Sequence, residues 1–184
     1  MKALKDLGIV VEGVRQPRPS DRETAGRKGI WTAAQCGQFL AGVADDRRYL
    51  AWVLVVVCGL RRGELAGLKW PKVDLPSGLL HVRWQRAVIE GGVLEKEPNG
   101  RSRHRLAVGP ALIAEFGVHQ LRQQSEIDAF GLAYRRGGYV FCKEDGMPYH
   151  PKYFTDRFRA MCAHAVVLMI DGRELSCLLA CAVA

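Results

Sequence analysis

The most constraining feature of the sequence is an apolar run of twelve residues, YLAWVLVVVCGL, from Tyr49 to Leu60. The run is well short of the ~18 to 20 residues that a helix needs to cross a bilayer, so it excludes a membrane span. A helix that is apolar on all faces lies in the middle of a folded domain. The run therefore predicts a central buried helix that ends at Gly59.

Length and composition favour one globular domain. The chain has 184 residues, of which 48% are hydrophobic, and this is ample for one packed core and tight for two. Residues 1–29 are rich in proline, glycine and charge and show no periodicity. We therefore expect a basic linker or remnant over residues 1–29 and a single domain over residues 30–184.

The charge balance points to a class of partner. Lys and Arg outnumber Asp and Glu by 27 to 19, which gives a net charge of +8 and favours polyanions, either nucleic acid or an anionic membrane surface. The first residues do not form a secretory signal, and the six cysteines contain no CxxC pair, so we expect reduced thiols in the cytoplasm. The five histidines show no zinc spacing with the cysteines, so no metal site is predicted.

The remaining patterns predict a mainly α fold with a small three-stranded antiparallel β-meander (α+β). Apolar periodicity and capping residues predict helices from Thr32 to near Asp45, from Tyr49, in residues 61–70, from Pro110 and from Pro151. Alternation predicts the strands of the meander over residues 78–89, 93–97 and 103–108. In the first strand, the predicted buried face carries Leu80, Val82 and Trp84. Residues 125–138 are expected to form an irregular loop.

The segment CGLRRGELAGLKW, residues 58–70, carries the clearest chemistry. Arg61 follows the buried helix directly, so a rigid element would hold its guanidinium, and Glu64 three residues later could orient it. The planar guanidinium suits two non-bridging phosphate oxygens. One alternative is a surface arginine paired with Glu64 across a helical turn. Another is a helix-turn-helix, although Pro71 falls where the recognition helix would run.

This segment, continued by Val73-Asp74-Leu75, resembles the first arginine box of the tyrosine recombinases (phage integrases). The resemblance runs in order over residues 30 to 175. Residues 97–105 are similar to the basic hairpin of that family, and residues 139–148 are similar to its VFxxxDGxP segment. The alternative is a basic domain that resembles the family by chance.

The resemblance implies site-specific DNA recombination and DNA integration, in which a tyrosine attacks a phosphodiester and rejoining follows through a phosphotyrosine. It implies no metal and no cofactor. The partners it implies are double-stranded DNA and an intact recombinase or other protomers on DNA.

The resemblance assigns roles residue by residue. Arg61 matches the first catalytic arginine and Glu64 its acidic neighbour, while Arg173 matches the second arginine. Asn99 stands at the place of the hairpin lysine, and Lys96 could replace that lysine or be a solvated strand residue. Ile170 stands where the second box has a histidine.

All five tyrosines precede Arg173, and none matches the nucleophile of the family. We therefore expect an integrase-like catalytic domain that lacks its C-terminal part and does not cleave DNA alone. The alternative is a non-catalytic DNA-binding remnant.

Two basic clusters complete the predicted DNA contacts. The first cluster surrounds the hairpin turn, and the second lies on the helix that begins at Pro151. Such side chains bind backbone phosphates without reading sequence, although charge clusters of this kind are also common on solvated surfaces. The predicted DNA-binding residues are Arg101, Arg103, His104, Arg105, Lys152 and Arg157.

Overall fold

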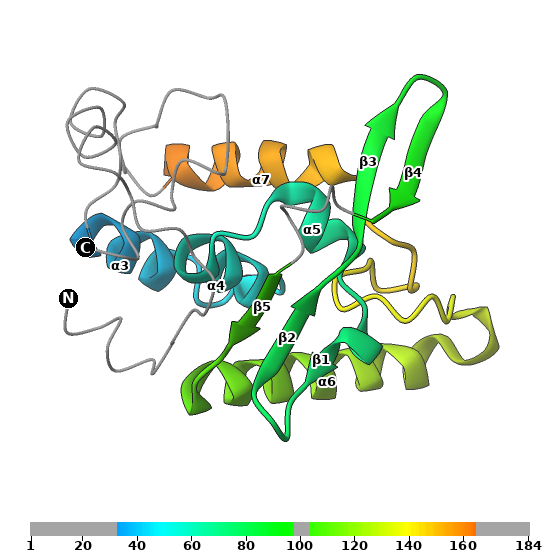
Figure 1. Ribbon diagram of the computed structural model, residues 1–184, viewed down its shortest axis with the longest axis horizontal. Helices are drawn as coiled ribbons and strands as arrows, with labels where there is room; N and C mark the ends of the chain where they lie inside the picture. The colour runs from blue at the N-terminus through cyan, green and yellow to red at the C-terminus, as the bar shows by residue number, and fades with distance from the viewer. Residues whose placement is uncertain (1–32, 98–103, 165–184) are drawn as a thin grey trace.

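A computed structural model describes residues 33–97 and 104–164, so the expected linker at 1–29 lies outside the described residues. The predicted class is confirmed, because the described chain is mainly helical with small antiparallel sheets (Figure 1). No helix in these two ranges is long and apolar enough to span a membrane.

The first two helices follow the sequence closely. Helix α3 spans Ala33–Gly42 and helix α4 spans Tyr49–Cys58. Helix α4 ends where Gly59 adopts a left-handed conformation with φ of 67°. The Gly59 N–H donates to the Val55 carbonyl, and the Leu60 N–H donates to the Leu54 carbonyl. Glycine takes this conformation without the strain that a side chain adds. The predicted buried helix and its end at Gly59 are both confirmed.

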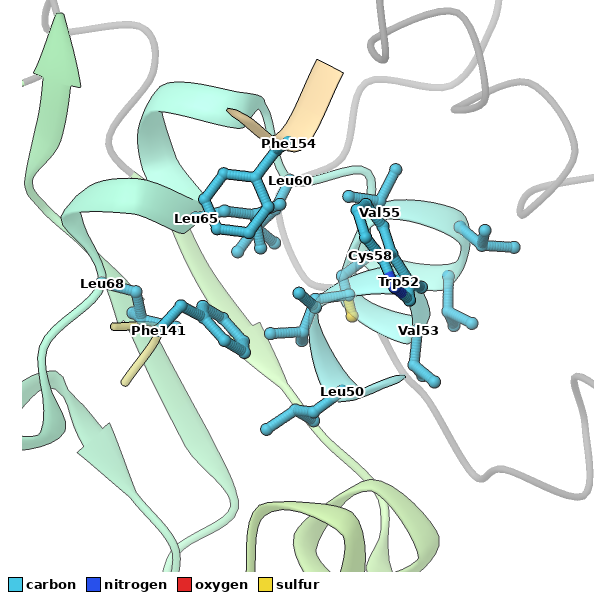
Figure 2. Close-up of a cluster of buried hydrophobic side chains, with 14 of the residues drawn as sticks. Leu50, Trp52, Val53, Val55, Cys58, Leu60, Leu65, Leu68, Phe141 and Phe154 are labelled. Carbon is cyan, nitrogen blue, oxygen red and sulfur yellow. The ribbon is translucent and has the colours of Figure 1, made fainter. Parts of the chain in front are cut away.

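Helix α4 forms the centre of the hydrophobic core, with all its residues from Leu50 to Cys58 buried. Figure 2 shows its side chains facing residues of several other elements, among them Leu65, Phe141 and Phe154. Trp52 and Phe154 meet edge to face, with ring centroids 6.2 Å apart. The helix is therefore the element against which the rest of the domain packs.

The cysteines of the described ranges are all buried, and they are Cys36, Cys58, Cys142 and Cys162. Burial raises the pKa of the Cys58 thiol to about 12 and that of Cys162 to about 11. Both thiols are therefore protonated at neutral pH.

The strands form two sheets instead of one meander. Strands β1 (Val73–Asp74), β2 (Leu79–Val82) and β5 (His104–Ala107) form an antiparallel sheet with β2 in the middle. Strands β3 (Gln85–Ile89) and β4 (Gly92–Lys96) form a separate hairpin.

The prediction of one continuous strand over residues 78–89 is wrong at Arg83 and Trp84, where the pairing breaks. Leu80 and Val82 are buried as expected, whereas Trp84 is 37% exposed. The break has a physical reason, because β2 pairs with β5 while β3 turns to pack against helix α5 (Arg62–Gly67).

Helix α6 is longer than the sequence suggests. It spans Pro110–Phe130 and is followed by a 3₁₀ turn, η3, over Gly131–Ala133. The loop expected from residue 125 is therefore wrong for 125–130. The helix continues there because Glu126 pairs with Arg47 from the loop before α4, and Ile127 packs on a small buried cluster.

Helix α7 spans Pro151–His164 and buries Phe154 and Met161, as predicted. A polar network joins it to the loop before α4. Asp46 accepts hydrogen bonds from Arg48 and Arg157, and the Arg48 side chain also donates to the Tyr153 hydroxyl. Burial alone would raise the pKa of Asp46, but the hydrogen bonds from the two arginines outweigh it and hold the pKa well below its usual range.

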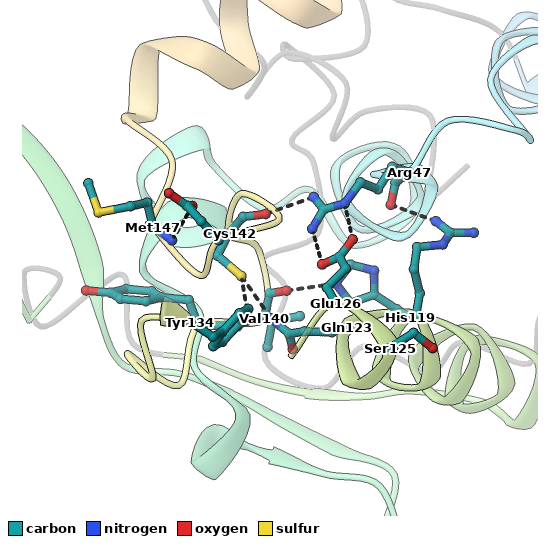
Figure 3. Close-up of polar contacts among 12 residues, drawn as sticks. Arg47, His119, Gln123, Ser125, Glu126, Tyr134, Val140, Cys142 and Met147 are labelled. Atoms are coloured by element: carbon teal, nitrogen blue, oxygen red, sulfur yellow. Dashed lines mark hydrogen bonds and ion pairs between the residues drawn. The ribbon is translucent and has the colours of Figure 1, made fainter. Parts of the chain in front are cut away.

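A second network joins α6 to the segment before α7 (Figure 3). The Arg47 guanidinium binds both oxygens of Glu126 and also donates to the Cys142 carbonyl and the Tyr149 hydroxyl. Gln123 donates from its amide to the Tyr139 carbonyl and to the Cys142 sulfur. These bonds fix the irregular segment 139–149 in one position.

Candidate functional site

Arg61 stands at the junction of the buried helix α4 and the short helix α5. It is the residue that precedes the first turn of α5, and its backbone N–H donates to the Glu64 carboxylate at 2.9 Å. The other oxygen of Glu64 lies 3.9 Å from the Arg61 guanidinium. The Arg61 side chain is 56% exposed whereas that of Glu64 is 2% exposed. A buried carboxylate thus fixes the backbone of Arg61, while more than half of its side chain is open to solvent.

Two glycines bring α5 unusually close to the hairpin. A Cβ at Gly63 would lie 2.9 Å from the Arg86 carbonyl oxygen, and a Cβ at Gly67 would lie 2.8 Å from the Gln85 Cα. Only glycine allows this approach, because real Cβ atoms do not come so near to backbone. The spacing of four residues places both glycines on one face of α5. Helix α5 therefore rests directly on the backbone of β3.

The register of the hairpin brings Lys96 towards the same side. Lys96 in β4 pairs directly with Gln85 in β3, and directly opposed residues share one face of an antiparallel pair. The Gln85 Cβ lies 3.7 Å from the position of a Cβ on Gly63, so that face is the one against α5. Lys96 is exposed. Its side chain starts on the face of the hairpin that α5 covers, and its role stays a prediction.

Helix α7 adds cations beside α5. The Arg62 guanidinium donates to the Thr155 hydroxyl at 3.4 Å and so links the first turns of the two helices. Lys152 pairs with Asp156 at 2.8 Å, and Arg157 pairs with Asp46 at 3.2 Å. The cation of each pair is exposed to solvent. An exposed ion pair contributes little stability, so a phosphate can replace the carboxylate.

The structure places only part of the predicted site. Arg101, Arg103 and Arg173 lie outside the described residues. His104 begins strand β5, and the exposed Arg105 follows it opposite His81. Arg61, Glu64 and Lys96 are thus the predicted catalytic residues that the described ranges contain, and they gather around α5 and β3.

The sequence patterns did not predict a cluster of charged residues that surrounds Tyr139. Lys69 lies 4.7 Å from the centre of the Tyr139 ring, and the Arg86 guanidinium carbon lies 5.7 Å from it. Glu95, the cross-strand partner of Arg86, binds the Lys69 ammonium at 2.9 Å. Arg86 also donates to the Tyr149 carbonyl. This cluster fastens the base of the hairpin to the body of the domain.

Sequence signals for this cluster are weak. Lys69 and Glu95 are 26 residues apart, and no periodicity links them. The Gly63 and Gly67 spacing was the one available signal, because two glycines four residues apart in a helix indicate a close packing partner. That signal would have indicated a contact for α5 without naming β3.

The hydroxyls of three tyrosines contact other side chains of the domain. The Tyr149 hydroxyl accepts a hydrogen bond from Arg47 at 3.1 Å, the Tyr153 hydroxyl accepts one from Arg48, and the Tyr134 hydroxyl lies 3.4 Å from the Cys142 sulfur. Burial raises the pKa of Tyr134, and the hydrogen bond to Cys142 raises it further. Burial raises the pKa of Tyr149 as well. The five tyrosines of the chain all lie in the described ranges, at Tyr49, Tyr134, Tyr139, Tyr149 and Tyr153.

The described side chains around α5 include several guanidinium and ammonium groups. In residues 33–97 and 104–164, no three side chains of His, Cys, Asp or Glu gather as a metal-binding set. His119 is buried, with its Nε2 2.7 Å from the Val140 carbonyl oxygen, and burial lowers its pKa.

Comparison with known proteins shows the fold. No protein-family model matches the chain, and no curated protein sequence matches it either. Among solved structures, the Tn1549 transposon integrase in complex with transposon right end DNA is similar, with a TM-score of 0.66 and 20% identity over 84% of this chain. XerA recombinase is similar with a TM-score of 0.60 and 14% identity over 83% of this chain.

These likenesses confirm the tyrosine recombinase-like fold that the sequence resemblance implies. The matched part covers 52% of the integrase chain and 48% of the XerA chain, so the chain spans about half the length of these structures.

Proposed function

We propose that the chain binds double-stranded DNA through backbone phosphates and belongs, by function, to the DNA recombination and integration systems. One observation carries the proposal: Arg61 is fixed at its base by buried Glu64 and by the contact of α5 with β3, yet 56% of its side chain is exposed. An arginine whose backbone is already fixed loses less conformational freedom when its planar guanidinium binds two phosphate oxygens. The net charge of +8 supports a polyanionic partner.

The proposed interface is the side where α5, the hairpin and α7 meet. Its exposed cations include Arg61, Arg62, Lys96, Lys152 and Arg157, and the predicted contacts at Arg101 and Arg103 would extend it beyond the described residues. In a phosphoryl transfer such fixed cations stabilise the charge that develops in the transition state. Other protomers on the same DNA are the proposed protein partners, and the site of action is the cytoplasm.

Binding is tested by titrating a fluorescent duplex at several salt concentrations. We expect log affinity to fall linearly with log salt, as counterion release requires. Arg61→Ala should weaken binding to every duplex alike. It should also reduce the slope of log affinity against log salt by about 1, because one phosphate contact is lost. Arg122→Ala on α6, which removes the same charge from another helix, is the matched control. Equal effects of the two variants, or affinity independent of salt, would contradict the proposal.

We further propose that these 184 residues alone do not form a covalent link to DNA. Three tyrosine hydroxyls are held in hydrogen bonds or sulfur contacts, and Tyr139 is buried with Lys69 and Arg86 near its ring. Burial raises the pKa of Tyr49, the fifth tyrosine. A raised pKa keeps a phenol protonated and so weakens it as a nucleophile. This observation favours the second candidate function, which is DNA binding without cleavage.

A trapping assay separates the two functions. A library of random duplexes with a bridging sulfur at each scissile position captures a phosphotyrosyl intermediate, because the sulfur leaving group cannot reattack efficiently. We expect retention of the library on the protein and no band of covalent adduct on a denaturing gel. An adduct that disappears when one tyrosine is replaced by phenylalanine would show that this chain cleaves DNA by itself.

A further inference from the structure

The tip of the β3–β4 hairpin is apolar and acidic in a basic protein. Residues 87–95 contain Glu90 and Glu95 and neither lysine nor arginine. Val88, Ile89 and Leu94 are each about half exposed, at 53%, 47% and 47%. Glu95 pairs with Lys69 at the base, so exposed Glu90 sets the charge of the tip. Because Leu94 pairs with Ala87, it shares one face of the hairpin with Ile89, while Val88 lies on the other face. We name the side chains of Ile89, Glu90 and Leu94 the hairpin patch.

A second exposed apolar patch has the opposite charge. It lies where α6 ends and η3 follows, and its apolar members are half-exposed Phe130 and fully exposed Leu132. Arg135 and Arg136 come next, both exposed, and neither forms an ion pair within the described ranges. We name Phe130, Leu132, Arg135 and Arg136 the turn patch.

Both patches are held in fixed positions. The hairpin pairs over five residues of each strand, and the Lys69, Arg86 and Glu95 contacts fasten its base to Tyr139. The turn is fastened by hydrogen bonds from the Arg135 N–H to the Asp145 carbonyl and from the Trp70 N–H to the Gly138 carbonyl, each at 2.9 Å. Fixed patches lose little entropy when they associate.

The arrangement suits a symmetric pair. Figure 1 shows the hairpin and the C-terminal end of α6 at the same end of the long axis, with the hairpin projecting beyond α7. In a two-fold dimer, a first patch on one subunit contacts a second patch on its partner, and the symmetry repeats the same contact in the reverse direction. Two copies turned against each other at this end would therefore bring each hairpin patch to a turn patch.

We propose that this end of the molecule is an interface with a second copy of the chain, in which each hairpin patch covers the partner's turn patch. Apolar side chains would leave water on both sides, and Glu90 would meet Arg135 and Arg136 of the opposite copy. DNA is the wrong occupant for the hairpin patch, because Glu90 pairs with no cation of the described residues and its carboxylate repels phosphate. The proposal does not depend on the DNA-binding function.

The test measures the mass of the full-length chain in solution by sedimentation equilibrium over a wide range of concentration. We expect a reversible monomer–dimer equilibrium. Glu90→Arg should weaken it roughly tenfold or more, and so should the double replacement of Arg135 and Arg136 by glutamate, because each places like charges together. The combined variant carries reversed charges on both patches and should regain most of the affinity.

Matched controls separate the interface from general effects of charge and from unfolding. Lys143→Glu reverses another exposed charge and should leave the equilibrium unchanged, and circular dichroism should show the same folded state for every variant. A chain that is monomeric at all concentrations would overturn the proposal. A dimer that is insensitive to the reversals, or a combined variant that stays as weak as the single ones, would also overturn it.

Discussion

The two glycines of α5 provide the sharpest test of how Arg61 is held. A methyl group at position 67 would lie 2.8 Å from the Gln85 Cα and 3.0 Å from the Trp84 carbonyl oxygen. Both are backbone atoms, so neither can rotate away as a side chain could. Gly67→Ala must therefore separate α5 from β3 or distort the hairpin.

The size of the effect follows from two opposing contributions. Overpacking of this kind costs about 1–3 kcal/mol, whereas alanine stabilises a helix by about 0.5–1 kcal/mol relative to glycine. Gly117 in α6 is the matched control, because a Cβ there would have no atom within 4 Å. Because Gly67 is the last residue of α5 and Gly117 lies inside α6, the helix contribution is smaller at Gly67. The difference between the two variants is therefore the contact plus at most about 0.5–1 kcal/mol of helix propensity. We expect Gly67→Ala to be less stable than Gly117→Ala by about 1–3 kcal/mol.

Urea unfolding followed by tryptophan fluorescence measures this difference, with the slope against urea as a check that both variants unfold alike. Gly117→Ala should unfold at a higher urea concentration than the unmodified chain and Gly67→Ala at a lower one. Equal stability of the two variants would refute the reasoning, because it would mean that α5 does not rest on the backbone of β3. The anchoring of Arg61 would then lose its main support.

Three further predictions concern buried polar groups. Burial lowers the pKa of His119 in the folded state, so the free energy of unfolding should fall as the pH drops below about 6.5, and His119→Gln should flatten this dependence in unfolding curves at several pH values. Glu126→Gln leaves the Arg47 guanidinium without its anionic partner and should cost about 1–3 kcal/mol in urea unfolding. Glu64→Ala should cost about 1 kcal/mol through loss of the cap on the Arg61 N–H, and Glu64→Gln, which keeps an acceptor, should recover most of it in thermal melts.

Local patterns predicted most of the helical fold. The apolar run of α4 and the left-handed Gly59 determine where that helix lies and ends, and the spacing of Phe154 and Met161 determines the buried face of α7. Errors arose where distant residues decide the structure. Glu126 lies 79 residues from Arg47, and that pair helps to keep α6 helical where its own sequence is polar.

The same distinction applies to the site. Arg61 and Glu64 are three residues apart, so their contact could be predicted from the sequence. The break before β3 could not be predicted, because Trp84 continues the alternation of β2 and only the packing of Gln85 against α5 ends it. Lys96 owes its place to that packing, so its position relative to α5 emerges only in three dimensions.

The buried thiols allow local opening of the structure to be measured without an added probe. Cys58 lies in the main core and Cys142 in the smaller cluster beside α6, and a thiol reagent reaches either one only when the surrounding structure opens. Rates of modification, resolved peptide by peptide by mass spectrometry, would therefore give two separate opening frequencies. Similar rates would indicate that the domain opens as one cooperative unit. Faster modification of Cys142 would indicate that the segment before α7 opens more often than the main core.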